Sequence, residues 1–174
     1  MKKLMVMIAV LTAALFIAGC ATSGPTVSDK LSEAKSNAPA GVLIGQGSAK
    51  EGSKEAAEKK AKDRALFALV KGINFIAGDI VDDAVTAGRL TTADATELKQ
   101  KVSAALTRSA LNRAVKVDSG TIGKDEAWAV YYMDKADVLK EIEQAVAASN
   151  PPRGFNTNSF DAKYPAGAAR EWKN

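Results

Sequence analysis

The side chains that most often carry out chemistry in proteins are almost absent from this 174-residue chain. It contains one cysteine, Cys20, and no histidine. Zinc sites draw mainly on cysteine and histidine, and a serine or cysteine nucleophile usually needs a histidine base. Carboxylates, lysines, tyrosines and hydroxyls remain. We therefore expect a protein that is not an enzyme and that holds no metal and no cofactor.

Three carboxylates lie close together, at Asp79, Asp82 and Asp83. Asp79 and Asp83 share one face of a predicted helix, but calcium loops interleave their ligands with a glycine turn, and that pattern is missing. A hydrolase built on carboxylates alone would need two of them to converge in one cleft. No spacing among Asp79, Asp83 and Glu97 indicates such a pair. The cluster is typical of a solvated helix end.

Cys20 follows a segment with the composition of an export signal. Residues 2 and 3 are lysines, Leu4 to Ile17 is an uncharged apolar stretch, and Ile17-Ala18-Gly19-Cys20 brings small residues before the cysteine. The apolar stretch is shorter than the ~20 residues of a membrane-spanning helix. A cleavable signal peptide is therefore the better interpretation.

This arrangement resembles the lipobox of bacterial lipoprotein signal peptides. The resemblance implies cleavage between Gly19 and Cys20, and attachment of diacylglycerol and an N-acyl chain such as palmitate to Cys20. Because several acyl chains together make anchoring stable, we expect a membrane partner through lipid. Residue 21 is Ala21 and not the aspartate that retains lipoproteins in the inner membrane, which favours the outer membrane of the cell envelope.

Loss of residues 1–19 removes two of the 24 basic residues and none of the 20 acidic ones, so the net charge falls from +4 to +2. Such a balanced surface does not predict nucleic-acid binding. Four regions follow from composition. We expect a signal peptide at 1–19, the lipidated cysteine with a flexible tether at 20–40, one domain at 41–149 and an aromatic-containing tail at 150–174. A short helix around 29–35 is compatible with the tether.

Within the domain, hydrophobic periodicity predicts six elements in the order β-α-α-β-β-α. A strand over 42–49 precedes a helix capped by Ser53 and a second helix from about Thr92. Two alternating segments around Gly123-Lys124-Asp125 form a hairpin, and Asp134 caps the last helix. We expect an α+β fold, a small antiparallel three-stranded sheet with helices packed on one face.

A stripe of mainly small residues on the first long helix predicts close packing against the sheet. It consists of Ala57, Ala61, Ala65, Ala68, Gly72, Ile76 and Ile80. Gly45 and Gly47 on the first strand also indicate close packing. A phosphate-binding loop is the alternative, but the third glycine is Gly52, which does not have the spacing of that fingerprint. Two glycines in the helix, Gly72 and Gly78, predict a bend between them unless tight packing compensates for their low helix propensity.

The lipobox, the Gly45-Gln46-Gly47-Ser48-Ala49 strand end, the alanine-rich helix start over 55–65 and the closing strand over 127–133 together resemble the Lpp-twenty family of bacterial lipoproteins. The resemblance covers roughly residues 41–146. It implies a non-enzymatic, membrane-tethered structural role, and related domains in flagellar envelope lipoproteins add a flagellar scaffold as an alternative. It supplies no catalytic residues.

Aromatic side chains mark the candidate interaction surface. Trp128 and Tyr132 point to one face of the closing strand, and they would be exposed if nothing covers that face. The tail carries four more aromatics, too many for a solvated segment, so it should dock on this domain or on a partner. These four are Phe155, Phe160, Tyr164 and Trp172.

Together these observations predict a lipid-anchored structural or protein-interaction module that self-associates or binds envelope proteins. A second alternative is a periplasmic carrier of a small apolar ligand, held between helices and sheet. The close packing indicated by the small-residue stripe speaks against a large cavity.

Overall fold

The computed structural model describes residues 24–148. Its sheet has three antiparallel strands, β1 (Val42–Lys50), β2 (Val115–Ile122) and β3 (Glu126–Asp134), in the spatial order β1-β3-β2. The central strand pairs Tyr131 with Gly45 on one side and Trp128 with Gly120 on the other. The predicted α+β fold and the predicted hairpin are confirmed.

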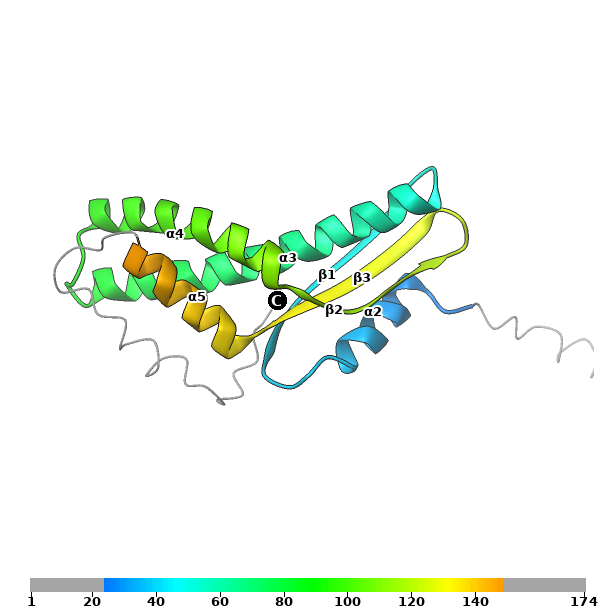
Figure 1. Ribbon diagram of the computed structural model, residues 1–174, viewed down its shortest axis with the longest axis horizontal. Coiled ribbons are helices and arrows are strands. Elements are labelled where there is room, and N and C mark those ends of the chain that lie inside the picture. Colours follow the sequence, from blue (N-terminus) through cyan, green and yellow to red (C-terminus); the bar gives the residue numbers. More distant parts are fainter. Residues whose placement is uncertain (1–23, 149–174) are drawn as a thin grey trace, which may run out of the picture.

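Three of the four described helices have the order that the sequence predicts. α3 (Lys54–Thr86) lies along one face of the sheet and continues beyond it (Figure 1). There α4 (Thr92–Arg113) packs against α3, and α5 (Lys135–Ala148) packs against α4. Ser53 caps α3 by accepting a hydrogen bond from the Ala56 N–H at 3.3 Å, and Thr91 caps α4 in the same way. α3 runs through both of its glycines as one 33-residue helix.

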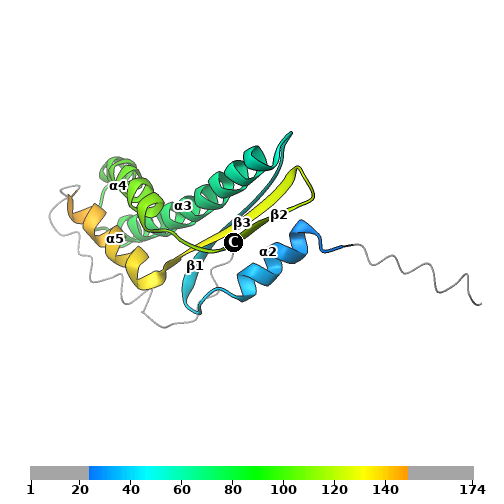
Figure 2. The same cartoon turned by 45° about the vertical axis from the view of Figure 1, so that its right-hand side comes forward.

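The fourth helix, α2 (Val27–Ser36), lies on the opposite face of the sheet (Figure 2). The expectation that helices cover one face alone was therefore incomplete. Thr26 and Asp29 form a capping box, in which the Thr26 N–H donates to the Asp29 carboxylate at 2.8 Å. These bonds from Thr26 hold the pKa of the Asp29 carboxyl below its usual range. Part of the predicted tether thus belongs to the folded domain.

The face of the sheet toward α3 is packed with small residues. A Cβ at Gly45 would meet the Ala65 carbonyl oxygen and lie 2.7 Å from the Leu69 nitrogen. A Cβ at Gly47 would likewise collide with α3 backbone. Only glycine permits this approach, which confirms the predicted close packing. The remaining members of this buried contact are Ala49, Ala57, Ala61, Ala65, Ala127 and Ala129.

Beyond the sheet, the second half of α3 shares one core of large side chains with α4 and α5. This helical end holds most of the main apolar core. α4 contributes Leu98, Val102 and Leu106, and α5 contributes Ile142 and Val146. The core of α3 here includes Ile73, Ile76, Ile80 and Val81.

β2 departs from the predicted alternation. Its register with β3 shifts between Lys116 and Asp118, so Val117 is the extra residue of a bulge. Val117 packs under α2, whereas Val115 is 48% exposed. The two valines therefore lie in different environments, because the bulge separates them and Val115 lies at the rim of the sheet, next to the end of α4.

Candidate functional site

Two residues of the predicted interaction surface, Trp128 and Tyr132, lie within the described part of the chain, and they differ in their surroundings. Trp128 is only 6% exposed, because α2 covers it together with Val130. The condition under which Trp128 would be exposed, an uncovered second face of the sheet, is therefore not met. Tyr132 is half-buried and lines a surface pocket. The other predicted site residues, Gly19, Cys20, Phe155, Phe160, Tyr164 and Trp172, lie outside the described residues.

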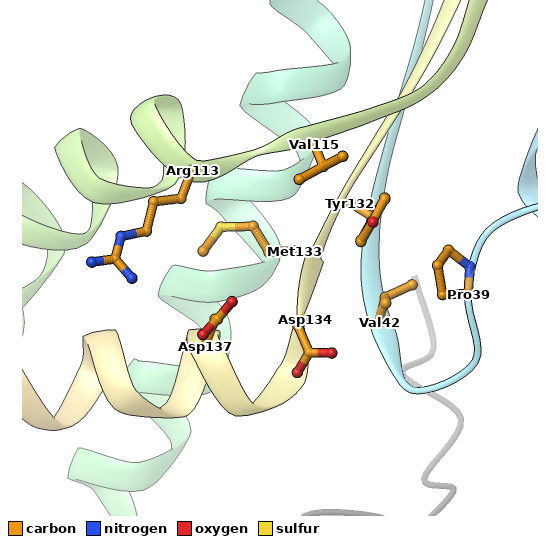
Figure 3. A pocket seen from close by; sticks show the side chains of 8 residues that line it. All are labelled: Pro39, Val42, Arg113, Val115, Tyr132, Met133, Asp134 and Asp137. Carbon is orange, nitrogen blue, oxygen red and sulfur yellow. The ribbon is translucent and has the colours of Figure 1, made fainter.

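The pocket that contains Tyr132 lies at the junction between the sheet and the helical end, and we call it the junction pocket (Figure 3). It measures about 220 Å³ and opens to solvent. Its lining combines apolar side chains with one guanidinium and two carboxylates. The residues are Pro39, Val42, Arg113, Val115, Tyr132, Met133, Asp134 and Asp137.

Four separate segments converge there. Pro39 lies in the link between α2 and β1, and Val42 begins β1. Arg113 ends α4, Val115 begins β2, and the remaining residues span the end of β3 and the start of α5. Asp134 is partly committed to structure, since its carboxylate accepts the Ala136 N–H at 2.8 Å. This cap fixes the direction in which α5 leaves β3.

A buried carboxylate supports the helical wall of the junction pocket. Glu141 of α5 is buried against α4, where Ser109 donates a hydrogen bond to it and the Arg113 guanidinium lies 2.9 Å from its carboxylate. A buried charge needs such partners to offset its desolvation. The Arg113 side chain is thereby held at the pocket by an ion pair.

Exposed apolar side chains occur on both sides of the α4–β2 connection. Leu111 near the end of α4 is 51% exposed, and Val115 at the start of β2 is 48% exposed. A solvated pocket whose lining combines charged groups with apolar side chains, among them the exposed Val115, has the composition of a small protein-binding surface. The sequence pattern does not predict this surface, because Val115 alternates with polar residues in the way that a buried strand residue does.

Sequence reasoning also missed two exposed phenylalanines on α3. Phe67 is 70% exposed and Phe75 is 75% exposed. A helical projection would have found them, because both lie away from the stripe of Ala57, Ala61 and Ala65 that faces the sheet.

The three carboxylates of the acidic cluster on α3 all have interaction partners. Asp82 pairs with Lys99 of α4 at 2.6 Å, and Asp79 and Asp83 also have interaction partners. Within residues 24–148, no group of three or more cysteine, aspartate or glutamate side chains is arranged to hold a metal ion. Asp82 and Asp83 are exposed, in agreement with the predicted solvated helix end.

None of the helices between residues 24 and 148 combines the length and the hydropathy needed to cross a membrane. Comparison with protein-family models gives no match, and neither the curated proteins nor the solved structures contain a significant match. The resemblance to the Lpp-twenty family therefore stays a prediction from the sequence.

Proposed function

We propose that this protein is a lipid-anchored, non-enzymatic envelope lipoprotein whose domain acts as a structural or protein-interaction module. The observation that carries the proposal is the lysine-led apolar segment that ends at Ile17-Ala18-Gly19-Cys20. Cleavage before Cys20 would leave a lipidated N-terminus. Its acyl chains would attach the protein to the membrane, with the outer membrane favoured by Ala21.

The position of α2 supports a short connection between anchor and domain. Only residues 21–26 separate Cys20 from the first residue of α2. Seven residue steps span at most about 25 Å. Because α2 packs on Trp128 and Val130 of the sheet, the folded domain would remain close to the membrane surface.

The junction pocket is the surface we propose for a protein partner. Its apolar lining would accept an apolar side chain, while Arg113, Asp134 and Asp137 would orient charged groups around it. Its volume of about 220 Å³ is below the roughly 300–1,000 Å³ of typical small-molecule pockets. This disfavours the carrier of a small apolar ligand.

The anchor is tested by the mass of the mature protein purified from its native cells. We expect residues 1–19 to be missing and Cys20 to carry diacylglycerol and an N-acyl chain. In a Cys20→Ala variant, the protein should lose both the acyl mass and its membrane association. A mature protein with an unmodified Cys20 would overturn the lipoprotein assignment.

The interaction role is tested by crosslinking in intact cells, followed by affinity purification. We expect a discrete complex with this chain itself or with envelope components, flagellar ones among them, that decreases in the Cys20→Ala variant. Val115→Glu should reduce the complex, since it places a charge at the junction pocket. Ser119→Glu introduces the same charge on an exposed position of β2 outside the pocket lining and should leave the complex unchanged.

Recovery of the monomer alone from cells with the native protein would contradict an interaction module. A complex that survives Val115→Glu and Ser119→Glu equally would keep the module but place its contact outside the junction pocket.

A further inference from the structure

An exposed stripe of basic and aromatic side chains runs along α3. Its members recur at steps of three and four residues, which keeps them within one face of the helix. All five are exposed, and we call them the α3 outer stripe: Lys60, Arg64, Phe67, Lys71 and Phe75.

Two large apolar side chains at this exposure call for a specific explanation. Phe67 and Phe75 are the two most exposed of the large hydrophobic residues identified in the described chain, at 70% and 75%. They are two turns apart, with Lys71 between them. Phenylalanine beside lysine and arginine is the composition of helix faces that lie at a lipid headgroup boundary.

The charge of this part of α3 favours an anionic surface. Between Lys60 and Phe75 the basic residues are Lys60, Lys62, Arg64 and Lys71, and the one acidic residue is Asp63. Lys60 pairs with Glu51 at 2.5 Å, but Lys71 forms no ion pair with any residue in the described range. Basic side chains near a membrane gain from the negative potential of anionic lipids.

The stripe also lies on a side of the domain that a short anchor can bring to the membrane. Arg64 donates to the Ser48 carbonyl oxygen of β1 at 2.5 Å, so the stripe faces past the β1 edge of the sheet rather than straight away from it. The N-terminal ends of α2 and α3 lie at the same end of the molecule (Figures 1 and 2). The anchor therefore leaves the domain near the start of the stripe.

The length of the anchor connection allows the α3 outer stripe to reach the membrane. α2 and α3 sandwich the sheet, and two packing layers of about 10 Å each separate them. The connection from Cys20 to Val27 reaches about 25 Å, which exceeds that thickness. Phe67 and Phe75 lie about 20 and 30 Å along α3 from its start, at 1.5 Å per residue. A domain resting on its β1 edge would place both rings at the bilayer while Cys20 remains inserted.

We propose that the α3 outer stripe is a second membrane contact, which binds the headgroup region of an anionic bilayer and lays the anchored domain along its surface. This inference rests on the proposed lipid anchor. A second copy of the chain and the C-terminal tail would match the basic charge of the α3 outer stripe less well than an anionic bilayer. A second copy would bring an identical basic stripe, and the tail from Pro151 to Asn174 has four basic and two acidic residues.

The test uses the full mature chain, residues 20–174, with Cys20 coupled to a maleimide lipid in phosphatidylcholine vesicles that contain one-third phosphatidylglycerol. The only cysteine of the chain makes this coupling specific. Phe67→Trp and Phe75→Trp are placed separately in a Trp172→Phe background, where the remaining native tryptophan, Trp128, is buried. Leu111→Trp, exposed on α4 and outside the stripe, is the matched control.

We expect brominated lipids to quench the emission of the Phe67→Trp and Phe75→Trp proteins at least twofold, and that of the Leu111→Trp protein no more than the background. Lys71→Glu, or vesicles without phosphatidylglycerol, should reverse most of the quenching. Absent quenching at both stripe positions, or equal quenching at all three, would overturn the proposal.

Two further outcomes would also overturn it. If deletion of residues 149–174 increases acrylamide quenching of the Phe67→Trp protein without vesicles, the tail covers the stripe. If acrylamide quenching instead falls as protein concentration rises, a second copy covers it. Failure of the anchor in cells is recognised separately, by an unmodified Cys20, because the chemical coupling supplies an anchor in the vesicle experiment.

Discussion

The two ends of the domain are packed in opposite ways. At the sheet end, α3 approaches β1 so closely that Gly45 and Gly47 have no room for a Cβ. At the helical end, α3 meets α4 and α5 through large side chains such as Ile73, Leu106 and Ile142. Shape therefore limits the sheet end, whereas buried apolar area stabilises the helical end.

The largest effect should come from adding volume at the sheet end. In Gly45→Val the new side chain would collide with the Ala65 carbonyl and with Leu69, and backbone cannot retreat as a flexible side chain can. We expect the free energy of unfolding to fall by more than about 3 kcal/mol, at or beyond the upper end of overpacking effects. Urea denaturation measures it.

Gly52→Val is the control for this substitution, since a Cβ at Gly52 meets no atom within 4 Å. Its free energy of unfolding should stay within about 0.5 kcal/mol of the native value. If the free energy of unfolding fell no more in Gly45→Val than in Gly52→Val, the α3–β1 contact would be looser than these distances imply.

The helical end should respond to the loss of volume instead. Leu106→Ala removes a side chain that is 2% exposed in the core between α3 and α4. We expect a loss of about 3 kcal/mol, from the transfer of the missing methyl groups and the remaining cavity. Leu111→Ala on the exposed side of the same helix should change stability little. A similar loss in both would contradict the assignment of Leu106 to the core.

The third prediction concerns the other face of the sheet end. Ala34 of α2 is 1% exposed against Trp128 and Val130, so Ala34→Glu would bury an unpaired carboxylate or release α2. We expect a loss of about 2 kcal/mol and a red shift of the Trp128 emission in a Trp172→Phe background. Ser32→Glu, exposed on the same helix, should leave the emission unchanged. Unshifted emission in both variants would contradict the packing of α2.

The sequence predicted most of the elements because their signals are local. Ser53, Thr91 and Gly123 mark two helix starts and the hairpin turn, and Gly123 has a φ of +67°. The surroundings of α2 are rich in small polar residues, and that composition predicts a tether. The capping box of Thr26 and Asp29 was the local signal that predicts a folded helix there.

The junction pocket was harder to predict because it is not local. Arg113, Val115 and Tyr132 come from three elements, and they meet at one opening because Val115 pairs with Tyr132 in the sheet and directly follows the end of α4. The burial of Glu141 was also hard to predict from the sequence, because it depends on residues of another helix. Its position on α5 reads as part of a polar face, yet Ser109 and Arg113 of α4 provide partners that allow it to be buried.

The smallest predicted effect separates glycines that the fold requires from one that it does not. Gly78 lies inside α3 at the helical end, where an added Cβ would meet nothing within 4 Å. Gly78→Ala should therefore increase the free energy of unfolding by about 1 kcal/mol, because alanine has the higher helix propensity.

Gly72→Ala should gain less than Gly78→Ala, since its Cβ would lie 3.4 Å from the Leu43 side chain, at the lower limit of an ordinary van der Waals contact, whereas Gly78 has free space. With Gly45→Val, the three substitutions should rank by the room around each Cα: stabilising at 78, near neutral at 72 and strongly destabilising at 45. The midpoints of urea unfolding give this ranking directly. A destabilising Gly78→Ala would mean that α3 needs a glycine for bending there, and that the helical end is limited by shape as well.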